Sequence, residues 1–175
     1  MLSAQANDKI VNATTPELFS SYPTPGDIIK CGENKLKNII QPIGLAPTKA
    51  RNIIKTCSIL VEKHDSNVPG TRAALEKLPG VGRKTANVVL NEGFGHPTIA
   101  VDTHVFRVAN RTGLAPGKSV ALTEKRLLEV TPTKWKLNAH RYLILHGRYV
   151  CKAKNFNCSI CTINKECEYS QKVFK

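Results

Sequence analysis

The stretch "LEKLPGVGRKTANVVL", Leu75 to Leu90, places two glycines, an arginine and a lysine within five residues, directly before an apolar helical pattern. Pro79 lacks a backbone donor and the glycines permit left-handed backbone angles, so a tight turn between two helices is predicted. The second helix would begin near Arg83, and its free N–H groups form an anion site. Gly80 and Gly82 would let a phosphate approach the main chain. Alone, the motif is compatible with phosphate binding and also with an ordinary glycine-rich corner.

Helical patterns continue along the rest of the chain. "KARNIIKTCSILVEKH" carries apolar side chains at helical spacing from Ile53 to Val61, which predicts an amphipathic helix with a basic outer face. "KSVALTEKRLLEV" and "NAHRYLILHGRYVC" predict two further helices, whereas "PTIAV" is too short to found a sheet. The sequence therefore predicts an all-α protein.

The charge balance narrows the function. Lys and Arg total 26 against 13 Asp and Glu, a formal net charge of +13 in 175 residues. Such an excess attracts polyanions, of which nucleic acid is the commonest inside cells, although a basic surface can also serve solubility. The apolar runs are too short for a membrane helix, and no basic leader precedes an apolar run. We therefore expect a soluble intracellular protein that does not bind membranes.

Four of the six cysteines crowd into "CKAKNFNCSICTINKEC" with the spacing C-x6-C-x2-C-x5-C. They are Cys151, Cys158, Cys161 and Cys167. In an intracellular chain, clustered cysteines indicate metal before disulfides. Structural zinc usually uses two close pairs with a longer insert between them, whereas four thiolates in a compact loop can hold a [4Fe–4S] cluster. The spacing alone leaves both metals open.

"LPGVGRKTANVVL" followed by "TIAVDTHVFRVANR" resembles the helix-hairpin-helix DNA glycosylases, in particular the bacterial endonuclease III family. "LSAQANDKIVN", "IGLAPTKARNIIKTC", "YLILHGRYVC" and the cysteine cluster extend the resemblance over nearly the whole chain. It implies a six-helix barrel domain over about residues 1–96 and a helical domain with a C-terminal cluster loop over 97–175, with a catalytic cleft between them.

The implied partner is double-stranded DNA with damaged bases or abasic sites, bound by a monomer. The implied location is the bacterial cytoplasm, at the nucleoid, or the nucleus or mitochondrion of a eukaryote. The implied activity is that of a bifunctional DNA glycosylase and AP lyase in base excision repair, which removes oxidised pyrimidines and nicks the strand by β-elimination.

The resemblance assigns the catalytic lysine to Lys84 and the catalytic aspartate to Asp102. Lys84 would attack the sugar C1′ and form an imine, after losing a proton that the positive end of the helix and Arg83 disfavour. "VDTHVF" also predicts that Asp102 caps a helix, with Val101 and Phe106 as a hydrophobic staple. The two roles are compatible, because capping N–H groups would fix the direction of the carboxylate.

The resemblance also assigns contacts to DNA and metal. Reaching C1′ requires extrusion of the nucleotide, and Leu45 on its Gly/Pro-bounded loop is a plausible apolar wedge for the gap. In the family, this loop and the glutamine at Gln5 insert around the vacated space. The remaining DNA contacts would be Gly80, Gly82, Arg83, Lys152 and Lys154. The four clustered cysteines would hold a [4Fe–4S] cluster.

Family members begin with a helix and part of a second before the segment that matches "LSAQANDK". We therefore expect the active-site residues to be present and the core to be incompletely covered. Three alternatives remain open. They are a non-catalytic DNA-binding protein, an adenine-specific relative (a branch that typically lacks lysine at the Lys84 position), and a small iron–sulfur electron carrier.

Overall fold

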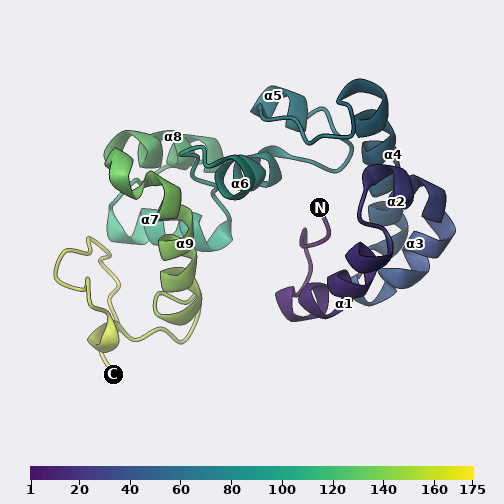
Figure 1. Ribbon diagram of the computed structural model, residues 1–175. Helices are drawn as coiled ribbons and strands as arrows, with labels where there is room; N and C mark the ends of the chain where they lie inside the picture. Colours follow the sequence, from purple (N-terminus) through teal and green to yellow (C-terminus); the bar gives the residue numbers. More distant parts are fainter. The chain divides into compact units, whose positions relative to one another are not determined.

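The computed structural model describes all residues from 1 to 175 and consists of helices joined by turns and loops, without a strand (Figure 1). The longer helices are α1 (Asp8–Ser21), α4 (Ala46–Lys63), α6 (Arg83–Phe94), α7 (Thr103–Thr112), α8 (Val120–Val130) and α9 (Thr133–Tyr149). The shorter ones are α2 (Pro25–Cys31), α3 (Glu33–Ile39), α5 (Arg72–Leu75) and the 3-10 turns η1 (Gln41–Ile43) and η2 (Cys158–Ile160). The predicted all-α class is confirmed. None of these helices is both long enough and apolar enough to cross a membrane.

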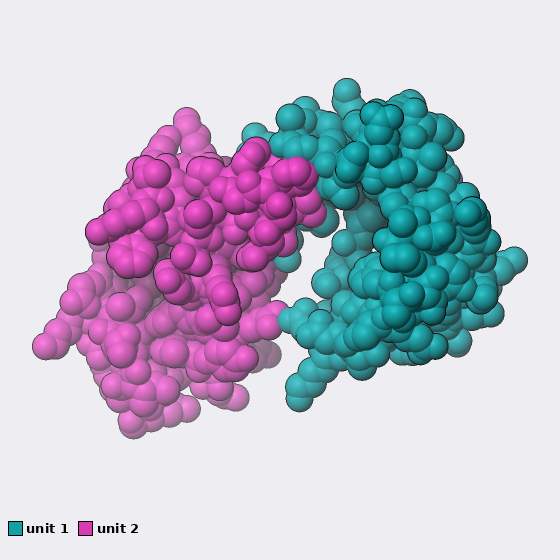
Figure 2. Space-filling view, viewed as in Figure 1, with its two compact units in different colours: residues 1–86 teal, residues 87–175 magenta.

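The chain divides into two compact units, Met1–Ala86 and Asn87–Lys175, which Figure 2 distinguishes by colour. The boundary falls within α6, so the first turn of that helix belongs to the first unit and the remainder to the second. Each unit contains a hydrophobic cluster of its own, which means that each buries apolar side chains independently.

Helix α4 is the centre of the first unit, because α2 and α3 both pack against it. Leu36 of α3, the following Ile40, and Ala50 of α4 are fully buried in this core. Val61, at the end of the predicted apolar stripe of α4, is instead 41% exposed. The buried stripe is therefore shorter than the sequence pattern indicated.

In the second unit, α7 packs against both α8 and α9. Val105 of α7, Leu127 of α8 and Ile99, which comes before α7, are fully buried in this core. A side chain on Gly147 of α9 would begin 2.9 Å from Cβ of His104, so only glycine lets α7 and α9 approach this closely. This contact fixes the position of α7, whose N-cap is the predicted site residue Asp102.

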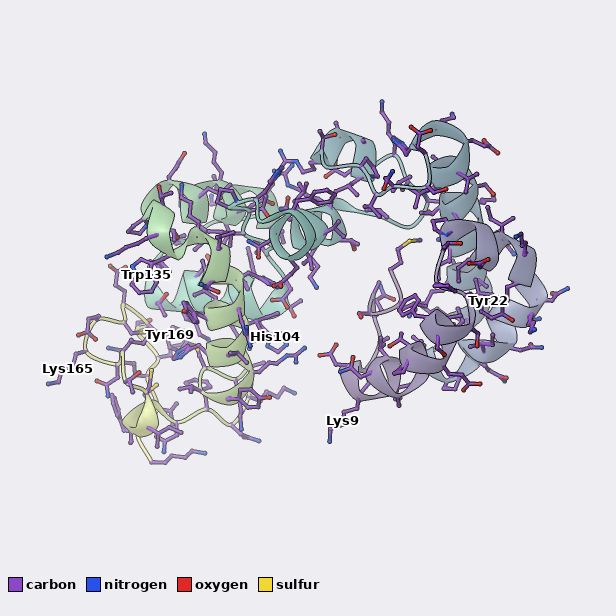
Figure 3. All side chains as sticks on the ribbon, in the orientation of Figure 1. Lys9, Tyr22, His104, Trp135, Lys165 and Tyr169 are labelled. Carbon is purple, nitrogen blue, oxygen red and sulfur yellow. The ribbon has the colours of Figure 1, made fainter.

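Helix α9 also carries an aromatic row that is open to solvent. Trp135, Tyr142 and Tyr149 recur every seven residues and are 49%, 53% and 66% exposed. The rings of Trp135, labelled in Figure 3, and Tyr142 meet edge to face with their centroids 6.5 Å apart. An exposed apolar row of this kind is unusual for a helix whose opposite face is buried. The expectation of an incompletely covered core stays a prediction.

Candidate functional site

The predicted turn lies between α5 and α6, in the first unit. Leu75 and Leu78 are buried beneath it, and the backbone N–H of Val81 donates to the carbonyl oxygen of Leu78 at 3.1 Å. Gly80 has a φ of +76°, a left-handed conformation that favours glycine. Gly82 faces open space, with no atom within 4 Å of where a side chain would begin. The main chain at Gly82 is therefore accessible to a bulky anion.

Lys84 lies in the first turn of α6, two residues after Gly82, and is exposed. Burial, together with the charges of Lys49 and Lys84, lowers the pKa of the Met1 α-amino group.

Gln5 and Leu45 are two of four exposed non-glycine residues of the first unit that adopt a left-handed backbone, the others being Asp65 and Ser66. Leu45 directly precedes α4 with φ 53° and ψ 27°, and it is 57% exposed. Gln5 has φ 50° and lies in the turns before α1. Such conformations cost free energy and cluster where chains contact ligands. The side chain predicted as a wedge is therefore available at the surface.

Sequence reasoning missed Lys49, whose side chain connects the segments that carry Gln5 and Leu45. Lys49 is only 7% exposed, and its Nζ donates to the carbonyl oxygen of Leu2 at 2.8 Å. Burial lowers the pKa of Lys49, because the ammonium form loses its hydration. Its place one turn before Ile53, on the apolar face of α4, was the available signal for a buried lysine.

In the second unit, Asp102 is the N-cap of α7, as the sequence predicted. Its Oδ1 accepts hydrogen bonds from the backbone N–H groups of His104 at 2.9 Å and Val105 at 2.8 Å. Val101 and Phe106, the predicted staple, both belong to the hydrophobic cluster of this unit. The Asp102 carboxylate is therefore half-buried and held in one direction.

The structure brings the four clustered cysteines together around one pocket. Their side chains line it from both ends of the cluster loop, and the members are Cys151, Cys158, Cys161 and Cys167. Nη1 of Arg111 lies 3.6 Å from Sγ of Cys151, and Nε2 of His146 lies 3.8 Å from Sγ of Cys161. None of the six cysteines forms a disulfide, and no group of three or more side chains is arranged as ligands of a single metal ion.

Arg111, in the last turn of α7, holds the cysteine loop in place and was also missed from the sequence. Its Nη1 donates to the carbonyl oxygen of Lys152 at 2.7 Å and its Nη2 to that of Ala153 at 3.3 Å. The guanidinium packs against the rings of Phe156, at 4.4 Å, and Tyr169, at 4.8 Å, the latter labelled in Figure 3. Charge, hydrogen bonds and ring contacts therefore all join α7 to the loop.

The remaining predicted contacts follow the division into units. Lys152 and Lys154 have exposed side chains on the cysteine loop. The first unit contains Gln5, Leu45, Gly80, Gly82, Arg83 and Lys84, and the second contains Asp102, the cysteines, Lys152 and Lys154.

Comparison with protein families gives a match over most of the chain. The sequence model of the HhH-GPD superfamily base excision DNA repair protein matches residues 1–133. Among curated proteins, the chain is 57% identical to endonuclease III of Haemophilus influenzae over 173 residues, which is 99% of this chain and 82% of that protein. It is 56% identical to endonuclease III of Escherichia coli over the same shares of the two chains.

Solved structures give a similar result. A trapped covalent endonuclease III–DNA intermediate superposes with a TM-score of 0.89 and 46% identity, over 95% of this chain and 79% of that one. A non-covalent endonuclease III–DNA complex matches with the same TM-score and identity, over 95% and 78%. A thermostable thymine-DNA glycosylase, 24% identical with a TM-score of 0.85 over 96% and 79% of the chains, shares the fold.

Proposed function

The chain belongs to the endonuclease III family, within the HhH-GPD superfamily of base excision DNA repair proteins, and we propose on this premise that it is a bifunctional DNA glycosylase and AP lyase. Its substrate is duplex DNA that carries an oxidised pyrimidine or an abasic site, bound by a monomer inside the cell. The observation that carries the proposal is the exposed amine of Lys84, which stands in the first turn of α6 immediately after the hairpin. A nucleophile there adjoins a backbone suited to hold a phosphate.

In the proposed reaction, the free amine of Lys84 attacks C1′ of the damaged nucleotide. The bond from C1′ to the base breaks, and the base leaves after it has taken up a proton. The sugar ring opens and the nitrogen forms an imine with C1′. Loss of a proton from C2′ then expels the 3′ phosphate by β-elimination, which nicks the strand 3′ to the abasic site.

Asp102 has the second catalytic role in this proposal. The two backbone N–H groups that it caps hold its carboxylate in one direction. A fixed anion can stabilise the positive charge that develops on the sugar as the base leaves, or assist proton transfer to or from the amine. Asp102 would thus combine a structural and a chemical task in one side chain.

Three surface segments of the first unit are proposed to bind DNA: the hairpin, the residue before α4, and the turns before α1. The hairpin at Gly80, Gly82 and Arg83 would hold a backbone phosphate. Gln5 and Leu45 would enter the space left by the extruded nucleotide, whose extrusion costs a few kcal/mol. The exposure of Leu45 supports that role, since a wedge must be available before DNA arrives.

The cofactor proposed for the four cysteines is a [4Fe–4S] cluster. The residues fit it, because four thiols line one pocket and thiolates are the ligands such clusters take. When bound, the cluster would cross-link the loop. Arg111 holds that loop against α7, and the loop presents Lys152 and Lys154 toward DNA phosphates. The division into a barrel domain, residues 1–96, and a cluster domain, residues 97–175, is part of the same proposal.

Trapping with borohydride on abasic duplex DNA tests the proposal, because borohydride reduces an imine to a stable covalent adduct. We expect the parent chain to give the adduct and Lys84→Met to give none. Lys55→Met, an exposed lysine of α4, is the matched control and should trap as the parent does. DNA binding without an adduct in the parent chain would instead support a non-catalytic DNA-binding protein.

A further inference from the structure

Lys49 is a buried charge that the proposed mechanism does not use. It is 7% exposed on α4, and its ammonium group faces the carbonyl oxygen of Leu2 rather than a carboxylate. Burial of an ammonium without an opposite charge is unfavourable, and burial lowers the pKa of Lys49 accordingly. A methionine of similar length would fill the same volume without that cost. The donor at this position therefore has a role other than filling the core.

The hydrogen bond from Lys49 joins two segments that are 47 residues apart in the sequence. One end is the series of turns at residues 1–6, which contains Gln5 with its left-handed backbone. The other end is the first turn of α4, where the backbone N–H of Lys49 donates to the carbonyl oxygen of Leu45 at 2.9 Å. Lys49 thus contacts both the turn that contains Gln5 and the backbone of Leu45, the predicted wedge.

We infer that Lys49 is a positioning residue that sets the spacing between Gln5 and Leu45, so that both side chains enter the gap in the duplex together. The inference rests on the proposed function. It adds that the two insertions are coupled through one buried amine. Without the Nζ–O contact, only the packing of Leu2 and Ala6 in the core would hold the turn at residues 1–6 near the start of α4. The turn would be less ordered relative to Leu45, and the entropy of ordering it would reduce binding. Binding of damaged DNA would weaken while binding of undamaged DNA would not.

The test is a comparison of affinities for two duplexes, one with a tetrahydrofuran abasic analogue and one undamaged. Lys49→Met should bind the undamaged duplex as the parent does, and its preference for the abasic duplex should fall by about tenfold. Lys49→Arg, which retains a donor, should keep more of the preference. Lys55→Met, on the outer face of the same helix, should keep all of it. Circular dichroism confirms that each variant is folded.

A double-mutant cycle separates positioning from general stability. In a Leu45→Ala background, Lys49→Met should have almost no further effect on the preference, because the wedge it positions is gone. Additive effects in the cycle, or an unchanged preference in Lys49→Met, would overturn the inference. If Lys49→Met does not fold, the cycle is run with Lys49→Leu, which also removes the donor. Failure of the parent to trap with borohydride would refute the proposed activity, yet these affinities would still decide the role of Lys49.

Discussion

A methyl group on Gly80 would begin 2.8 Å from Nδ2 of Asn52 on α4, closer than such atoms can approach. The hairpin therefore rests directly on α4, and the hydroxyl of Thr56 reinforces the contact by donating to the carbonyl oxygen of Pro79 at 3.2 Å. Leu45 directly precedes α4, and Lys84 directly follows the hairpin that packs on α4. Helix α4 therefore supports both residues.

Gly80→Ala should lower the free energy of unfolding, because the left-handed backbone alone costs about 1–2 kcal/mol and the contact with Asn52 adds to it. Gly82→Ala is the matched control, since its new methyl group meets open space, and we expect a change within about 0.5 kcal/mol. Affinity for DNA should nevertheless fall in Gly82→Ala if a phosphate approaches there. Urea denaturation and DNA titration measure both effects, and equal stability of the two variants would contradict the packing described.

Asp102→Asn should keep the fold and DNA binding but lose most of the strand-nicking activity, because asparagine caps helices as well as aspartate yet carries no charge. Asp102→Ala should in addition lose about 1 kcal/mol of stability with the cap. Ser119→Ala removes the cap of α8, where the serine hydroxyl accepts from the N–H of Leu122. It should cost stability alone. Turnover of Asp102→Asn near that of the parent would refute the catalytic assignment.

Arg111→Met should load iron less completely and release it faster to a chelator, because two loop carbonyls lose their donor and two rings lose the guanidinium. Arg111→Lys keeps the charge but not the planar fork, so an intermediate release rate is expected. Arg141→Met, an exposed arginine of α9, serves as the control. Iron and sulfide assays on the purified chains provide the measurement, and identical retention in all three would show that Arg111 does not hold the loop around metal.

The pKa of Lys49 is lowered in the folded chain, so the unfolded chain binds this proton more tightly. Unfolding then takes up a proton between the two pKa values, and the free energy of unfolding rises with pH in that window. The gain in the free energy of unfolding that comes from this proton uptake reaches its full value above the unfolded pKa of about 10.4. We expect the parent to gain stability relative to Lys49→Met as pH increases toward that value. A stability difference that is constant with pH would indicate that Lys49 is hydrated in the folded state.

Features set by neighbouring residues were predictable from the sequence. The hairpin follows from proline and glycine between apolar turns, and the cap at Asp102 follows from an acid directly before a helical pattern. The gathering of the four cysteines around one pocket agrees with their spacing. The hairpin and the cap each span a few residues and the four cysteines lie within 17, so the local pattern contains the information.

Lys49 and Arg111 were not predictable for the opposite reason. Lys49 bonds to a carbonyl 47 residues away, and Arg111 bonds to carbonyls 41 and 42 residues away. A backbone carbonyl leaves no trace in the sequence, so neither partner could be identified before the fold was known. The exposure of Val61 has a related cause. Helical spacing gives the direction of a side chain, but not how far along α4 the elements that pack against it extend.

The left-handed backbone at Gln5 and Leu45 has an evolutionary consequence. Each costs about 1–3 kcal/mol, which glycine would avoid, so Leu45→Gly should make the chain more durable while blunting its ability to discriminate lesions. Selection for heat resistance alone would therefore be expected to erode these two positions early. If a descendant lineage kept Gln5 and Leu45, selection for recognition of damaged DNA would have outweighed selection for stability.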